Sequence, residues 1–227
     1  MVVIAACALA VACAKHGAQD PLERMLEALG GRNAIGRLQS LSVSANCAGP
    51  SGHFHTWVES LRPGSVFFRQ SDGADSIAVW STPDSTWLSN GDRIVAGDAR
   101  VREFVRGHEF HLLLFEVESR FSGHTVAGRD TIEGSACTRI TMTDENGDPA
   151  ELLIDDHNGL PRMLELNPPE AQGPVRVYFD DWARAGDLLL FNSFRMTEGP
   201  GRSFLYRYLE IVPDGVDPAV FNPREFQ

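Results

Sequence analysis

After residue 40, apolar residues recur in short runs separated by turn-forming residues, and this pattern predicts a mostly β protein. The dipeptide Asn-Gly occurs three times between apolar runs, at Asn90-Gly91, Asn146-Gly147 and Asn158-Gly159. Both residues tolerate the positive φ angles of a type I′ turn, so the dipeptide is a strong hairpin signal. Three such signals without strand–helix alternation favour an antiparallel meander over a parallel α/β sheet.

Two segments have helical spacing instead. Asp20 is a suitable N-cap and Pro21 suits the first helical turn, so a helix is expected from there to Gly30-Gly31, followed by a short helical piece over roughly Asn33 to Leu38. Asp98 can cap a second helix, which we expect to be continuous over residues 98–119. The apolar-face positions of the two helices are Leu22, Met25, Leu26 and Leu29, and Val101, Phe104, Val105, His108, Leu112 and Phe115.

The predicted order is a helix, five or six strands, a second helix and about six further strands. No Pro/Ser-rich linker separates the two halves, so residues 20–227 are expected to form one domain. We predict an α+β, mostly β fold: one curved antiparallel sheet, an incomplete β-barrel, with the helices covering its concave face. Some strands are apolar on both faces; simple alternation directs Leu188, Leu190 and Phe194 to one side, and Leu189 and Phe191 to the other.

The first 19 residues are expected to be a leader rather than part of the domain. The apolar run from Val2 to Ala14 is too short to span a bilayer but has the length of a signal-peptide core. The small residues Ala10-Val11-Ala12 before Cys13 resemble a bacterial lipobox, in which the cysteine is lipidated (acyl chains such as palmitate) and becomes the mature N-terminus. An alanine-rich signal peptide cleaved elsewhere is the alternative. Because Ala14 is not aspartate, the resemblance implies an outer-membrane lipoprotein facing the periplasm.

The charge balance narrows the class of partner. Lys and Arg total 20 against 31 Asp and Glu, which gives a formal net charge of −11. No basic stripe is present to neutralise phosphates, so nucleic acid is not expected as a partner. Adhesion to anionic lipid headgroups is disfavoured for the same reason, and any membrane contact should be apolar or covalent.

The sequence contains no recognisable catalytic or metal-binding motif. His108 and His111 are three residues apart rather than the four that a zinc-protease helix requires, and His53 and His55 share a strand face without further ligands. The Gly-x-Ser-x-Gly motif and a Gly-rich phosphate loop are both absent. We therefore predict no catalytic residue, no metal and no cofactor.

Two cysteines, Cys47 and Cys137, lie in predicted strands of the domain. In an exported protein they can form a disulfide. The alternative is that each is a small buried apolar residue, the common role of a lone strand cysteine.

Four phrases of the chain carry a family resemblance: LEALGGRNAIGRLQSL before the first strand, STWLSNGDRIV at a mid-sheet hairpin, LLIDDHNGLPRMLEL in the second half, and YLEIVPDGVDPAVFNP at the end. Together they resemble the lipoprotein-localisation (LolA/LolB-like) superfamily. The resemblance implies an incomplete antiparallel barrel lidded by helices. It also implies a concave apolar surface, which in members of this superfamily accommodates acyl chains of lipoproteins or similar ligands.

The expected function is therefore non-catalytic: a lipid-anchored periplasmic protein that binds or hands on an acyl chain or lipid. Aromatic and large apolar side chains either line such a pocket or fill a core. The alternative function is a scaffold for another envelope protein, built on a dry, helix-filled barrel. The candidate lining residues are Trp57, Phe67, Trp80, Trp87, Leu112 and Phe115.

Overall fold

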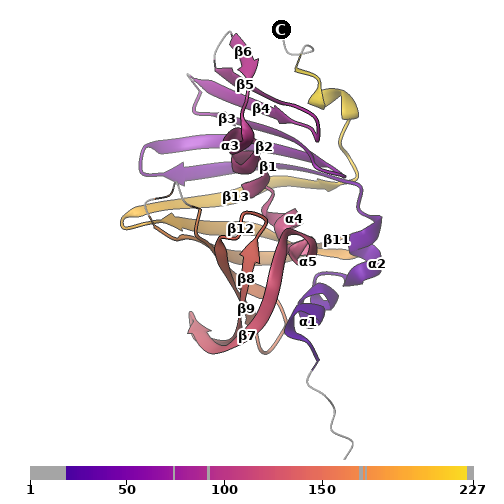
Figure 1. Ribbon diagram of the computed structural model, residues 1–227, viewed down its shortest axis with the longest axis vertical. Coiled ribbons are helices and arrows are strands. Elements are labelled where there is room, and N and C mark those ends of the chain that lie inside the picture. Colours follow the sequence, from indigo (N-terminus) through magenta and orange to yellow (C-terminus); the bar gives the residue numbers. More distant parts are fainter. Residues whose placement is uncertain (1–18, 74, 91–92, 169–170, 172, 224–227) are drawn as a thin grey trace, which may run out of the picture.

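The computed structural model describes residues 19–73, 75–90, 93–168, 171 and 173–223. Within these residues a single antiparallel sheet has the strand order β6-β5-β4-β3-β2-β1-β13-β12-β11-β10-β9-β8-β7 (Figure 1). The sheet is open, because β6 and β7 stand at opposite ends of the strand order and do not pair with each other among the described residues. The strands of the first half are β1 (Ser40–Gly49), β2 (Gly52–Leu61), β3 (Ser65–Ser71), β4 (Ser76–Ser81), β5 (Thr86–Asn90) and β6 (Arg93–Ala96).

The second half of the chain continues the same sheet, because the last strand pairs with the first. The pairing of β13 with β1 joins the two halves, with Leu41 opposite Pro213 and Ala48 opposite Leu205. The strands of this half are β7 (Phe121–Ile132), β8 (Ser135–Asp144), β9 (Pro149–Asp155), β10 (Pro161–Leu166), β11 (Val175–Ala185), β12 (Leu188–Glu198) and β13 (Arg202–Pro213).

All three Asn-Gly dipeptides mark hairpins, as predicted. They connect the antiparallel pairs β5–β6, β8–β9 and β9–β10. Gly91 itself lies outside the described residues. The single-sheet incomplete barrel is confirmed as well.

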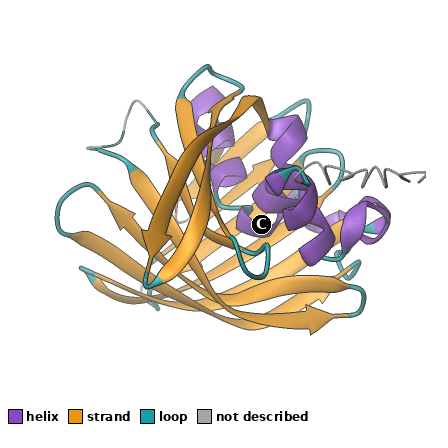
Figure 2. Ribbon diagram, turned by 90° about the horizontal axis from the view of Figure 1, so that it is seen from below, coloured by secondary structure: helices purple, strands orange, loops and turns teal. Residues whose placement is uncertain are grey.

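The α-helices lie inside the curve of the sheet (Figure 2). Asp20 caps the first helix by accepting from the backbone N–H of Leu22 at 3.0 Å, and Asp98 caps the third by accepting from Val101 at 3.1 Å. The elements are α1 (Pro21–Ala28), α2 (Gly31–Arg37), α3 (Ala99–Gly107), α4 (Phe110–Phe115), α5 (Val117–Arg120) and the 3₁₀ helix η1 (Pro218–Phe221).

The prediction of one continuous helix over residues 98–119 is wrong, because the segment breaks into α3, α4 and α5. At the first break, His108 donates from Nδ1 to the carbonyl oxygen of Phe104 at 2.7 Å, and Glu109 leaves helical geometry with φ −81° and ψ 52°. The break has a packing reason. All six residues of α4 are buried, whereas a straight helix buries only one face.

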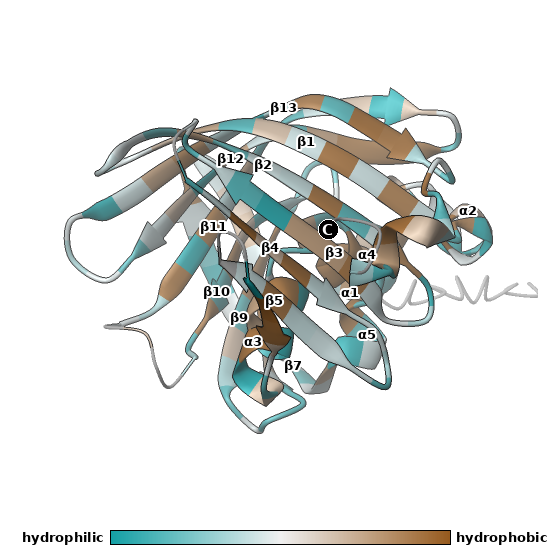
Figure 3. Cartoon of the chain, turned by 90° about the horizontal axis from the view of Figure 1, so that it is seen from above, coloured by the Kyte–Doolittle hydropathy of each residue, from teal (hydrophilic) through white to brown (hydrophobic). Residues whose placement is uncertain are grey.

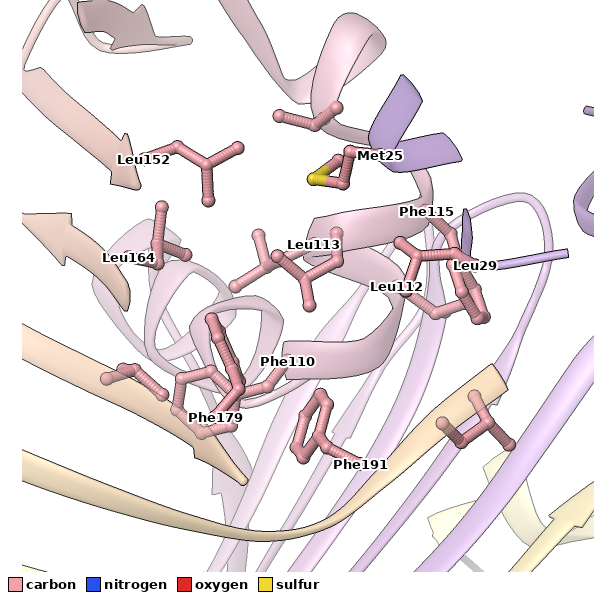
Figure 4. Packing of buried hydrophobic residues seen from close by; sticks show 14 of the residues in the cluster. Met25, Leu29, Phe110, Leu112, Leu113, Phe115, Leu152, Leu164, Phe179 and Phe191 are labelled. Atoms are coloured by element: carbon pink, nitrogen blue, oxygen red, sulfur yellow. The ribbon is translucent and has the colours of Figure 1, made fainter. Parts of the chain in front are cut away.

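The interior of the half-barrel holds two adjoining hydrophobic clusters. The larger joins α1, α2, α4 and α5 to β1 and to strands β7–β13, and ten of its residues are labelled in Figure 4. The smaller joins Val105 of α3 to β1–β4. Tyr208 and Ile211 of β13 pack against both clusters, so the interior is continuous across the junction of the two halves.

The outer face of the sheet is also apolar in places, and Figure 3 shows hydrophobic and hydrophilic positions along the strands. In β9, Leu152 and Ile154 belong to the interior cluster, whereas Leu153 packs with Cys137 and Met163 in a separate outer cluster. The prediction that some strands are apolar on both faces therefore holds for β9.

Strand β12 departs from simple alternation. Phe191 was expected on the face opposite Phe194, but both belong to the interior cluster, with their ring centroids 5.9 Å apart. The neighbouring strand β11 is distorted at this level, because Asp181 has φ 55°. A local distortion of this kind re-aims side chains and breaks the period of two.

Candidate binding pocket

The two ends of the half-barrel differ, because α1 and α2 close one of them. Leu189 at the start of β12 donates its N–H to the carbonyl of Leu29 at 2.9 Å. Gly30 permits this close approach: it has φ 129°, and a Cβ there would lie 2.6 Å from the carbonyl oxygen of Asp187. Arg24 of α1 donates to the carbonyl of Asp155 at 3.3 Å.

A cavity of about 800 Å³ opens at the other end. Its walls come from α3, α4, the β1–β2, β8–β9 and β12–β13 hairpins, and the connection between β10 and β11. The volume lies within the range of pockets that bind small molecules, about 300–1,000 Å³.

Apolar side chains from both halves of the chain form the inner wall. Phe110 and Leu113 project from α4, whose packing is seen in Figure 4. Phe54 of β2 contacts Tyr206 and Phe204 of β13 edge to face, with centroids 5.9 and 6.5 Å apart. The further apolar wall residues are Phe104, Phe121, Pro149, Ala150, Leu166, Pro168, Ala171, Val175 and Met196.

Charged side chains also border the cavity. Arg106 pairs with Glu145 at 3.4 Å, and Arg202 pairs with Glu198 at 3.1 Å. The wall includes six carboxylate residues and three arginines: Asp72, Glu103, Asp144, Glu145, Asp148 and Glu198, and Arg106, Arg120 and Arg202.

A buried ion network holds the helices beneath the pocket. Arg120 pairs with Glu109 at 2.9 Å and with Glu116 at 2.8 Å. Glu116 also accepts from Arg62 at 2.7 Å, and Arg62 donates to the carbonyls of Ile35 and Leu38. Burial alone would lower the pKa of Arg120, but Glu109 and Glu116 outweigh it and raise that pKa. The network fixes α4 and α5 against α2 and the β2–β3 turn.

The two histidines of the HEFH segment have structural partners. His111 is buried, stacks on Phe191 with centroids 3.8 Å apart, and donates from Nε2 to the Phe191 carbonyl at 3.0 Å. Burial lowers the pKa of His111 to about 4 and also lowers that of His108. In the described part of the chain, no group of three or more His, Cys, Asp or Glu residues is arranged to hold a metal ion.

None of the six residues named from the sequence as pocket lining lies on the wall of the large cavity. Trp80 lies opposite Phe67 on one side and Trp87 on the other, so the three share one sheet face. That face is the outer one, because the alternate residue Phe68 belongs to the interior cluster with Val105. Phe67 and Trp80 pack outside against Phe221.

The remaining three candidates are placed as follows. Trp57 lies on the same outer face, beside His55 and beneath the guanidinium of Arg69, which is 5.0 Å from its ring centroid. Leu112 and Phe115 are buried in the interior cluster. Leu112 also borders a small void beside Tyr208.

The cysteines Cys47 and Cys137 are free and buried. Cys47 belongs to the interior cluster, where burial raises its pKa to about 12. Cys137 belongs to the outer cluster of β8–β10. The two thiols thus lie on opposite faces of the sheet, and five strands separate β1 from β8, so the structure holds no disulfide between them. Cys13 lies outside the described residues.

The residues that do form the wall were missed for a simple reason. Phe54, Met196 and Phe204 lie near the hairpin ends of their strands, and the sequence does not reveal which hairpins meet. The only local signal was the alternation of side chains along each strand, which places every second residue on the same face of the sheet. In β2, Phe54 shares one face with Thr56 and Val58, and Trp57 lies on the other.

No protein-family model and no curated protein matches the sequence. Among the described residues, no helix has both the length and the apolar character needed to cross a membrane.

Solved structures do resemble the chain. A LolA superfamily protein from Nitrosomonas europaea superposes with a TM-score of 0.63 at 10% identity, over 87% of this chain and 96% of that one. A DUF1329 family protein from Desulfovibrio piger gives 0.60 at 13% identity, over 92% and 100%. A domain described as an outer membrane lipoprotein-sorting protein, from Vibrio parahaemolyticus, gives 0.56 at 13% identity, over 90% and 98%. At these identities the likeness concerns architecture, and the chain has the LolA-like half-barrel fold.

Proposed function

We propose that residues 20–227 form a non-catalytic domain that binds an acyl chain of a lipid or lipoprotein or hands it on. A lipid on Cys13 would hold the domain at the outer membrane, facing the periplasm. The observation that carries the proposal is the cavity of about 800 Å³, apolar at its inner wall and open at one end of the half-barrel.

The energetics suit an acyl chain. Each methylene transferred from water to an apolar wall contributes about 0.8 kcal/mol. Ordering the chain and its head offsets part of this gain. The wall residues Phe110, Leu113 and Met196 supply apolar contact without a polar group that would need a partner.

Binding can be tested with the full-length chain carrying Cys13→Ser, which cannot be lipidated at that residue. Calorimetry should show saturable binding of glycerol monolaurate. The ligand should also raise the melting temperature, because a free concentration of 100 times Kd adds about 2.7 kcal/mol to the free energy of unfolding. Met196→Trp places a larger side chain on the pocket wall. Because the indole ring takes up part of the cavity, binding should weaken at least about tenfold, or 1.4 kcal/mol.

The matched control is Leu205→Trp. Leu205 is 40% exposed on β13 and does not line the cavity, so the same replacement should leave binding unchanged. If no acyl probe raises the melting temperature of the folded protein, or if Met196→Trp binds as well as the unmodified pocket, the proposal fails.

A scaffold for another envelope protein is the second candidate. The observation that favours it is the aromatic strip on the outer face, where Trp87 is 37% exposed beside Trp80. Two results together would support this second function instead: the natural chain binds no acyl probe, and Trp87→Ser no longer captures the envelope protein that the natural chain captures.

A further inference from the structure

The charges around the pocket bear on which ligands it accepts, and this inference rests on the proposed function. We propose that the pocket selects amphiphiles by the charge of the head: it accepts an acyl chain with an uncharged or cationic head and disfavours one with a carboxylate or phosphate. The selectivity would reside in side chains of α3, the β8–β9 hairpin and the β12–β13 hairpin.

The arginines on the wall already have carboxylate partners. Arg202 pairs with Glu198 and Arg106 with Glu145, both within the wall. Arg120 forms ion pairs with Glu109 and Glu116 in the buried network. An anionic head would therefore have to displace a carboxylate of the protein to gain a guanidinium.

The carboxylates are in excess. Glu103 is exposed on α3, and Asp144 and Asp148 frame the β8–β9 turn, without an arginine partner among the described residues. Asp144 accepts from the N–H groups of Asn146 and Asp148 at 2.9 Å each, which holds its carboxylate at the turn. Repulsion of a second anion at this mouth is stronger than in bulk water, because the cavity wall excludes part of the solvent.

The test compares three probes of equal chain length at pH 8, below their micellar concentrations: dodecylamine, laurate and glycerol monolaurate. The protein is the full-length chain carrying Cys13→Ser. At about 0.01 M ionic strength, where the Debye length is about 30 Å, dodecylamine should bind at least about tenfold more tightly than laurate. At about 1 M, where the Debye length is about 3 Å, the ratio should fall toward one.

Single-charge variants locate the effect. Glu103→Gln and Asp148→Asn should each lower the amine-to-laurate ratio, whereas Asp84→Asn, at the exposed turn between β4 and β5, should not.

The outcomes separate the two proposals. Laurate binding as tightly as dodecylamine at low salt, or a ratio insensitive to Glu103→Gln and Asp148→Asn, overturns the charge selectivity and leaves the acyl-binding function standing. Failure of all three probes to bind the folded protein overturns the proposed function and this inference together.

Discussion

At the scale of single residues, His111 shows how a polar side chain is accommodated in an apolar core. Its ring is buried, stacked on Phe191 and bonded through Nε2 to the Phe191 carbonyl. Because the carbonyl is only an acceptor, Nε2 carries the proton. Burial lowers the pKa of His111 to about 4, so the ring is neutral at physiological pH.

This burial makes stability depend on pH. As the pH falls, the unfolded chain binds a proton at His111 near the ordinary pKa of 6.5, whereas the folded chain binds it only near pH 4. The stability due to the neutral ring is therefore complete above pH 6.5 and is lost as the pH falls toward about 4. We expect His111→Gln, which keeps an N–H donor, to lose less free energy of unfolding between pH 7 and pH 5 than the natural chain, by urea denaturation.

His157→Gln is the control, because His157 is exposed in the β9–β10 turn. It should show the same pH dependence as the natural chain. If His111→Gln also follows the natural chain across this window, the ring is not the group that titrates.

At the scale of elements, α4 is the part of the structure that joins core and pocket. Its residues Leu112, Leu114 and Phe115 are buried in the interior cluster, while Phe110 and Leu113 also line the cavity. The break before α4 makes this double role geometrically feasible, because a short helix can be surrounded on all sides. Ion pairs of Glu109 and Glu116 with Arg120 fix its two ends.

We expect Leu112→Asp to destabilise the domain severely. Leu112 is 4% exposed, so the change removes apolar contacts, which costs about 2–5 kcal/mol, and it buries a carboxylate without a partner. The same replacement at Val126, which is 57% exposed on the edge strand β7, should cost less than about 1 kcal/mol. Thermal melts of the two variants decide the matter; equal melting temperatures would mean that α4 is not packed as described.

At the scale of the whole molecule, the half-barrel is packed at one end and open at the other. The packed end carries α1 and α2, and the open end carries the pocket with its acidic mouth. The net charge of −11 disfavours electrostatic adhesion to an anionic membrane surface. A chain with these charges that stays at a membrane needs an apolar or covalent anchor.

We therefore expect Cys13→Ser to release the protein. In the native host, fractionation should find the natural chain with the membranes and the Cys13→Ser chain in the soluble periplasm. Cys7→Ser is the matched control in the same leader and should leave the protein at the membrane. A Cys13→Ser chain that remains in the membrane fraction would contradict lipidation at this residue.

The sequence by itself determined the local structure. Asp20 and Asp98 identify helix starts, and the Asn-Gly dipeptides identify hairpins, because caps and tight turns depend on residues only a few positions apart. An open antiparallel sheet also followed, since strand runs without intervening helices leave few alternatives. The packing of the helices on its inner side was predictable from their apolar faces.

Only the tertiary structure decided which face of each strand is covered and where space remains. Trp80 and Phe67 were expected inside, but η1, more than 130 residues later in the chain, packs on them from outside. The pocket wall joins β2, α4, β9 and β13, whose strand ends converge only when β1 pairs with β13. Burial depends on such long-range contacts, whereas alternation fixes only that neighbouring side chains point to opposite faces.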